Sequence, residues 1–170
     1  MEERPPPSDW AEMQIRGLIL DPQSESPIVV LREMGESLYL PIWIGAFEAN
    51  AIALALESVR LKRPMTHDLL RSTVEELGAT LQRIEIHALL DGTYFARLVV
   101  HQAYGETVEI DARPSDAIAL ALRARAPIWV ARAVLDHAIA SARATELSDE
   151  KRLKEWLENA KPEELGKYSM

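Results

Sequence analysis

The chain has 170 residues, of which 48% are hydrophobic and 27% are charged, and its formal net charge is −8 at pH 7. This composition is typical of an ordinary globular protein and excludes a disordered or fibrous chain. The negative charge disfavours a protein that coats nucleic acid non-specifically, because such binding depends on an excess of Lys and Arg.

The sequence also limits the chemistry and the location of the protein. It contains no cysteine, which excludes disulfides, thiolate metal sites and cysteine nucleophiles. No apolar run reaches the roughly 18 residues of a membrane span, and the first residues, MEERPPPSDW, lack the apolar segment of a signal peptide. We therefore expect a cytoplasmic protein without a membrane partner, and a flexible N-terminal segment over residues 1–12.

The first half of the chain predicts three strands and two helices. The strands are MQIRGLIL, PIVVLREM and YLPIWIG, separated by polar turns. The run AIALAL at 51–56 alternates like a strand, but alanine is a strong helix former and a poor strand former, so we predict a helix. This helix is apolar on nearly all sides, which requires burial on more than one side. A second helix is expected between Thr66 as N-cap and Gly78 just past its C-terminus.

The second half repeats this order. The strands LQRIEIHALL, TYFARLVV and ETVEIDA precede a second AIALAL run at 117–122. Pro114, Ser115 as N-cap and Asp116 in the first turn predict the start of a helix there. The segment RARAPIWVARAVLDHAI then aligns with the second helix of the first half.

This shared order predicts an α+β fold built by internal duplication of a unit of three strands and two helices. We expect mainly antiparallel sheets and buried apolar helices. The predicted domain covers residues 13–144, with repeat one at about 13–78 and repeat two at about 79–144. A C-terminal helical tail is expected over residues 145–170.

Four stretches carry a resemblance to a known family: LPIWIGAFEANAIALAL, RPMTHDLL, LLDGTYFARL and IDARPSDAIALALR. Together they resemble the bifunctional nuclease domain family of bacteria and plants, and the tail WLENAKPEELGKY is similar to the ends of bacterial members. The resemblance implies a duplicated α+β domain with nuclease activity, since plant members are described as degrading both RNA and DNA. Many plant members also carry a UVR-type helical motif at the C-terminus, which this tail does not resemble.

A phosphodiesterase must activate water and neutralise a phosphate, and it often holds a divalent metal through carboxylates. Polar side chains of the family-like stretches could fill these roles. The predicted catalytic residues are Glu48, His67, Asp68, Asp111 and Asp116. Their spacing matches no recognised metal motif, so no metal ligands are assigned, and Mg²⁺ or Mn²⁺ is the candidate cofactor.

The densest of these stretches, DARPSD, also has a structural interpretation. Ser115 can cap a helix, Asp116 can complement its dipole, and Arg113 can pair with Asp111. The functional interpretation is that backbone N–H groups at this helix start bind a phosphate and that Arg113 clamps it. Both interpretations stay open.

Glu48 and His67 leave similar alternatives. Glu48 lies at the start of an apolar helix, where it is either a partner of the helix dipole or a buried functional acid with a raised pKa. A lone histidine at a helix start is more often structural than catalytic, although His67 could act as a general base.

The predicted substrate-binding residues are cations and polar groups that follow or begin the AIALAL helices: Arg113, Ser115, Arg60, Lys62, Arg63, Arg123 and Arg125. They could form a basic surface for nucleic acid on an otherwise acidic protein. Cations at helix ends are also expected from the helix dipole alone.

We expect a nuclease of broad specificity acting on RNA and DNA. The alternative is a non-catalytic oligomeric module that binds nucleic acid or a protein partner through a basic surface. A third hypothesis is a small-molecule enzyme with an anion site near Arg113. The apolar helices favour a homo-oligomer, and a dimer is the simplest choice. Convergence of the predicted acids in one open site would favour catalysis.

Overall fold

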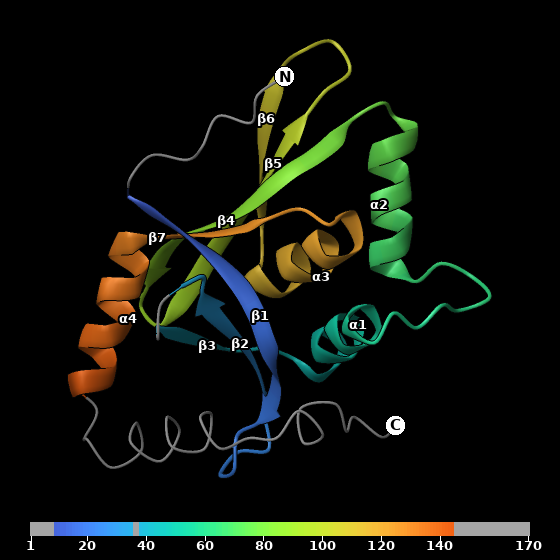
Figure 1. Ribbon diagram of the computed structural model, residues 1–170. Helices are drawn as coiled ribbons and strands as arrows, with labels where there is room; N and C mark the ends of the chain where they lie inside the picture. Colours follow the sequence, from blue (N-terminus) through green and yellow to red (C-terminus); the bar gives the residue numbers. More distant parts are fainter. Residues whose placement is uncertain (1–8, 36–37, 145–170) are drawn as a thin grey trace.

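The computed structural model describes residues 9–35 and 38–144. This part of the chain folds into one mixed sheet and four helices, which confirms the predicted α+β class (Figure 1). The strands are β1 (Trp10–Leu20), β2 (Pro27–Glu33), β3 (Tyr39–Trp43), β4 (Thr80–Leu90), β5 (Thr93–His101), β6 (Thr107–Ala112) and β7 (Ile128–Ala131). The helices are α1 (Ala46–Leu56), α2 (Thr66–Glu76), α3 (Pro114–Ala124) and α4 (Arg132–Ala144).

The sheet consists of two antiparallel meanders joined by β7. Its strand order is β3-β2-β1-β7-β4-β5-β6. Strand β7 pairs antiparallel with β1 and parallel with β4, and the other neighbours are antiparallel. The mainly antiparallel pairing agrees with the prediction. Within the described residues, however, the strands form a single sheet. Strand β7 lies between β1 and β4, the edge strands at which the two meanders would otherwise end.

The two halves share three strands followed by a helix and then differ. In the first half α2 follows α1, whereas in the second half β7 lies between α3 and α4. The sequence IWVA favours a strand, since it is aromatic and β-branched, and Ile128 and Val130 are buried. The common element order is consistent with duplication, which stays a prediction.

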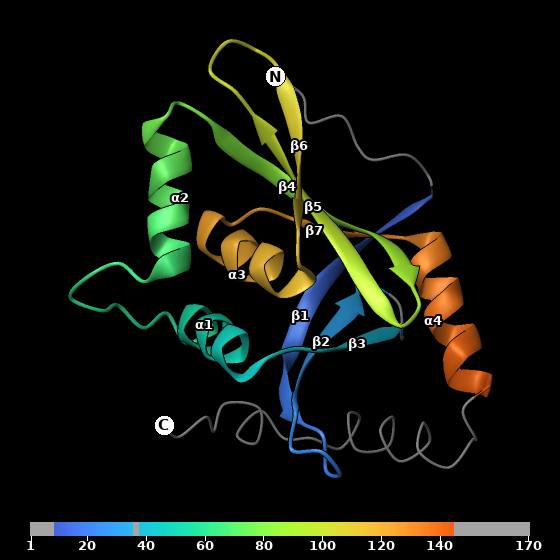
Figure 2. The ribbon, with the colours of Figure 1, turned by 180° about the vertical axis from the view of Figure 1, so that it is seen from behind.

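The two AIALAL helices are buried to different extents. Helices α1, α2 and α3 lie on one side of the strands, with α4 on the other (Figures 1 and 2). Residues 117–121 of α3 are all buried, as predicted. In α1 only Ala49 and Ile52 are buried, and Phe47 is 89% exposed. Within a single chain α1 is therefore not buried on more than one side, because it lies outside α3, and its burial between subunits stays a prediction.

Two predicted helix starts are shifted by local backbone chemistry. The N-cap of helix α3 is Arg113 and not the predicted Ser115. Pro114 takes the first helical position, as expected from the fixed φ of proline. Helix α2 has Met65 as N-cap, and the N–H of Met65 donates to Asp68 Oδ2 at 2.9 Å. The predicted end of α2 is confirmed, since Gly78 follows the C-cap with φ of +74°.

The terminal predictions fall largely outside the described residues. Strand β1 already begins at Trp10, within the segment expected to be flexible. The remainder of that segment and the predicted helical tail lie in residues 1–8 and 145–170, beyond the described part. None of the helices in the described ranges combines the length and hydrophobicity needed to cross a membrane.

The unequal burial of the two AIALAL runs predicts unequal stability effects. Leu120 of α3 is 1% exposed, whereas the corresponding Leu54 of α1 is only partly buried. We expect Leu120→Ala to lower the free energy of unfolding by about 2–5 kcal/mol, and Leu54→Ala to lower it clearly less. Urea unfolding of the two variants beside the wild type measures this difference. Equal losses would show that α1 is covered as completely as α3.

Candidate functional site

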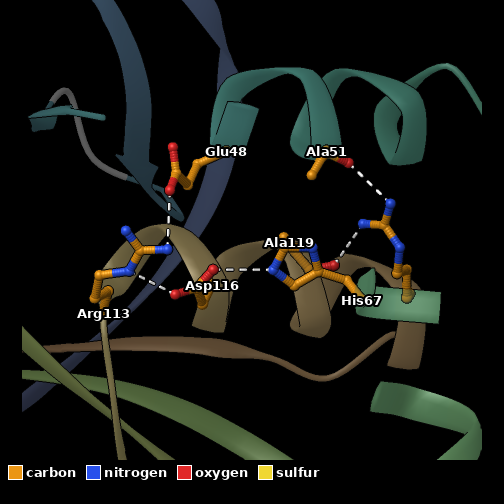
Figure 3. Close-up of polar contacts among 7 residues, drawn as sticks. Glu48, Ala51, His67, Arg113, Asp116 and Ala119 are labelled. Carbon is orange, nitrogen blue, oxygen red and sulfur yellow. Dashed lines mark hydrogen bonds and ion pairs between the residues drawn. The ribbon is translucent and has the colours of Figure 1, made fainter. Parts of the chain in front are cut away.

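Four polar side chains from three helices and one strand–helix junction meet in one cluster (Figure 3). Arg113 links two acids: its Nη2 is 2.9 Å from Glu48 Oε1, and its Nε donates to Asp116 Oδ2 at 2.7 Å. His67 Nε2 lies 3.0 Å from Asp116 Oδ1. We call Glu48, His67, Arg113 and Asp116 the polar cluster.

The local sequence places these groups at helix starts. Glu48 is the third residue of α1, Asp116 the third residue of α3, and His67 the second residue of α2. A carboxylate in the first turn is stabilised by the positive end of the helix dipole. Arg113 ends the extended backbone that leads into α3, and as its N-cap it reaches both acids. The cluster thus joins residues that are 49 positions apart in the sequence.

Gly45 gives the carboxylate of Glu48 the space that it occupies in the polar cluster. It is the N-cap of α1, and a Cβ added to it would collide with Glu48 Oε2. The carboxylate of Glu48 therefore folds back over the start of its own helix, into space that only glycine leaves open. The position of a glycine between YLPIW and the helix was the available signal.

Exposure changes steadily across the polar cluster. The side chain of Arg113 is 65% exposed, whereas that of His67 is 11% exposed, with Asp116 between them. Burial acts to raise the pKa of Asp116, but hydrogen bonds from Arg113 and His67 outweigh it and lower that pKa below 3.8. The bond to Asp116 raises the pKa of Arg113. Asp116 and Arg113 therefore form an ion pair within the cluster, which opens to solvent at the arginine.

Asp68 and Arg123 form a second ion pair behind the cluster. Arg123 Nε donates to Asp68 Oδ1 at 2.7 Å, and the arginine side chain is 7% exposed. Burial acts to raise the pKa of Asp68, but the Met65 N–H and Arg123 lower it. Both groups were predicted to serve the reaction directly. In the structure Asp68 caps α2, and the guanidinium of Arg123 is occupied by protein acceptors.

The other predicted site residues do not join the cluster. Asp111 is exposed on β6, and its side chain makes no hydrogen bond or ion pair within the described part of the chain. Ser115 is buried in the first turn of α3. The remaining cations are exposed, three in the connector between α1 and α2 and one at the end of α3: Arg60, Lys62, Arg63 and Arg125.

Within residues 9–35 and 38–144, no three His, Asp or Glu side chains are grouped so that they could hold a metal ion. In the polar cluster, both Glu48 and Asp116 already face Arg113. The described residues therefore present no preformed metal centre of three protein ligands.

Comparison with known proteins places this fold and site in a family. The sequence pattern of the bifunctional nuclease domain family matches residues 29–143, and this range includes all four residues of the polar cluster. The chain belongs to the bifunctional nuclease domain family, as the sequence resemblance predicted.

The chain is similar to a bacterial protein and to plant proteins. An uncharacterized protein of Mycobacterium tuberculosis is 36% identical over 163 residues, covering 91% of this chain and 97% of the relative. Bifunctional nuclease 1 of Arabidopsis thaliana is 31% identical over 107 residues, covering 61% of this chain and 33% of the plant protein. Bifunctional nuclease 1 of Oryza sativa is 30% identical over 109 residues, or 63% of this chain and 33% of the relative. The match thus spans about a third of each of these plant proteins.

The ion pairs of Asp116 predict a pH-dependent effect of Arg113. A folded-state pKa below 3.8 means that the carboxylate stabilises the fold above pH 3.8 and that this contribution is lost as the pH falls through the lowered value. We expect Arg113→Gln to raise the pKa of Asp116, measured by ¹³C NMR of its carboxyl carbon. The variant should be less stable than the wild type at pH 6, with the difference shrinking below pH 3.8. A pH-independent difference would contradict this assignment.

Proposed function

We propose that this chain is a nuclease of broad specificity that hydrolyses phosphodiester bonds of RNA and DNA in the cytoplasm, with the polar cluster as its catalytic site. The observation that carries the proposal is the meeting of Glu48, His67 and Asp116 around the exposed Arg113. Membership of the bifunctional nuclease domain family supports the reaction class. Names of plant relatives support a nucleic-acid substrate.

Arg113 is suited to bind the phosphate. Its side chain is the most exposed of the cluster, and it precedes the first turn of α3, where free backbone N–H groups favour an anion. Two carboxylates already contact this guanidinium. A phosphate therefore has to share the arginine with Glu48 and Asp116, which places the scissile bond next to both acids.

Two groups can accept the proton of the attacking water. His67 directs Nε2 at Asp116, so Nδ1 is its remaining basic nitrogen, and Asp116 stabilises the protonated ring. Glu48 is the other candidate base, with a side chain 18% exposed. In the proposed step the water oxygen attacks phosphorus and its proton passes to one of these bases. The bond to the leaving sugar oxygen breaks as that oxygen takes up a proton from solvent water, and the base later returns its proton to solvent.

Mg²⁺ or Mn²⁺ is the proposed cofactor. Magnesium at phosphate-processing sites is commonly held by one or two carboxylates together with substrate phosphates and water. Such binding needs no preformed group of three protein ligands. The role of the ion would be to neutralise charge that develops on the phosphate.

The test is cleavage of labelled single-stranded RNA and double-stranded DNA by purified protein with Mg²⁺, Mn²⁺ or EDTA. We expect Glu48→Gln and Asp116→Asn to lower kcat about 100-fold or more, because each removes an acid from the reacting centre. Folding of each variant is checked by urea unfolding. His67→Gln distinguishes the bases, since it should remove the acid limb of the pH profile only if His67 takes the proton.

Glu106→Gln is the matched control, because Glu106 is an exposed acid in the turn between β5 and β6. It should cleave like the wild type. Equal cleavage by all the variants would identify a contaminating nuclease. Absence of cleavage by a folded wild type under every metal condition would overturn the proposal.

A second function is favoured by an exposed apolar surface on α1, α2 and their connector. The large hydrophobic side chains exposed there are Phe47, Leu56, Val59, Leu61, Met65, Leu69 and Leu70. Such a surface is typical of a protein interface. It supports the alternative that the chain is a non-catalytic oligomeric module binding nucleic acid or a protein partner.

We propose a second copy of this chain as the occupant of that surface. The chain carries a net charge of −8, so two copies repel each other over most of their surfaces. The connector over residues 57–65 instead holds three cations and one acid. The exposed apolar side chains of this connector, Val59, Leu61 and Met65, therefore lie where the acidic charge of the chain is locally offset. Two copies can meet there with less repulsion between their acidic surfaces, and a closed dimer is the simplest result.

Sedimentation of the full chain tests the dimer. We expect Leu61→Glu and Leu69→Glu to shift the protein from dimer to monomer, because each places a charge in the apolar surface. Tyr104→Glu is the control, since Tyr104 is 97% exposed in the turn between β5 and β6. A wild-type monomer at all concentrations would contradict the dimer. A dimer that binds nucleic acid without cleaving it would favour the non-catalytic module.

A further inference from the structure

Arg123 is the most buried of the arginines that form ion pairs in the described part of the chain, with 7% of its side chain exposed. Its guanidinium reaches three helices. Nε donates to Asp68 Oδ1 of α2 at 2.7 Å, Nη1 to the carbonyl of Ala119 in α3 at 2.8 Å, and Nη2 to the carbonyl of Ala51 in α1 at 3.0 Å. Figure 3 shows the last two acceptors beside the polar cluster.

Each acceptor of Arg123 lies within one helical turn of a cluster residue. Ala51 follows Glu48 by three positions and Ala119 follows Asp116 by three, while Asp68 comes directly after His67. A helical turn holds about 3.6 residues, so each contact fixes the backbone that carries one cluster side chain. Arg123 therefore contacts α1, α2 and α3 in the turns that carry Glu48, His67 and Asp116.

Helix α2 depends on this link more than the other two helices. His67 is its only buried residue, and Leu69 and Leu70 are exposed. Apolar burial of α2 is small, since Val74 is a partly buried hydrophobic residue of this helix that packs against the core. Polar contacts with Arg123 remain: the Asp68 ion pair and a bond from Arg71 Nη1 to the Arg123 carbonyl at 3.3 Å.

We propose that Arg123 is a positioning residue of the site, whose guanidinium sets the spacing of α1, α2 and α3 and so brings His67 into contact with Asp116. It acts through protein acceptors and does not bind substrate. The planar guanidinium offers five N–H donors in fixed directions, whereas a lysine ammonium is a compact point charge that cannot match three separated acceptors. The catalytic part of this assignment rests on the proposed function, but the contact of His67 with Asp116 does not.

The test uses the full chain with Arg123→Ala, Arg123→Lys and the control Arg97→Lys. Arg97 is also a partly buried arginine paired with acids, Glu85 and Glu109, but it lies on β5. The first readout is the pKa of Asp116, measured by ¹³C NMR. Loss of the His67 contact should raise it toward 3.8 in both Arg123 variants and leave it unchanged in Arg97→Lys.

The second readout is cleavage of labelled RNA. We expect kcat of the Arg123 variants to fall about 100-fold, the scale of a misplacement of about 1 Å, while KM changes little. Guanidinium ion at millimolar concentration should partly restore kcat in Arg123→Ala, because it can refill the space among the three acceptors. The same ion should not restore Arg113→Gln, whose lost group is exposed.

The outcomes separate this proposal from the proposed function. An unchanged Asp116 pKa in folded Arg123 variants would overturn the positioning role, whether or not the protein cleaves RNA. A rise in KM with unchanged kcat would show that Arg123 binds substrate instead. If Arg123→Ala does not fold, Arg123→Lys and Asp68→Asn provide the same NMR measurement. A raised Asp116 pKa in a protein without nuclease activity would support the geometry and refute the proposed function.

Discussion

Burial of the second AIALAL helix is the constraint on which the arrangement of the molecule depends. Helix α3 is apolar over most of its surface, and residues 117–121 are completely enclosed. One sheet face can cover only one side of a helix, so α1 and α2 must cover the others. This requirement brings the starts of α1, α2 and α3 close enough for their polar first turns to touch. The site is therefore a consequence of how the core is closed.

Closing the core in this way leaves polar groups between helices, and the structure satisfies them with arginines. Arg113 lies at the open end and joins Glu48 to Asp116, whereas Arg123 lies at the closed end and joins Asp68 to two backbone carbonyls. Buried charges are tolerated only when such partners are present. The two arginines have different tasks because one is exposed and the other is enclosed.

The sequence predicted the elements better than their contacts. Alanine content predicted the two AIALAL helices, and the family-like stretches pointed to Glu48, His67 and Asp116, whose side chains the fold brings together around Arg113; their catalytic role stays a proposal. Strand β7 was missed as a separate strand, since four residues give too short a pattern to distinguish from the helix that follows. The contacts of Arg123 could not be predicted from the sequence either, because its acceptors Asp68 and Ala51 are 55 and 72 positions away. A helix-end cation has the same sequence pattern whether it faces solvent or the interior.

Strand β7 has a consequence for how the halves of the molecule depend on each other. It belongs to the second half of the chain, yet it pairs with β1 on one side and with β4 on the other. The four residues of β7 thus provide the hydrogen bonds that join the two meanders into one sheet. Neither half can complete its hydrogen bonds without the other, so a chain cut between α2 and β4 would leave two fragments with unpaired edges. The two meanders therefore depend on one another, and we expect them to unfold as one cooperative unit.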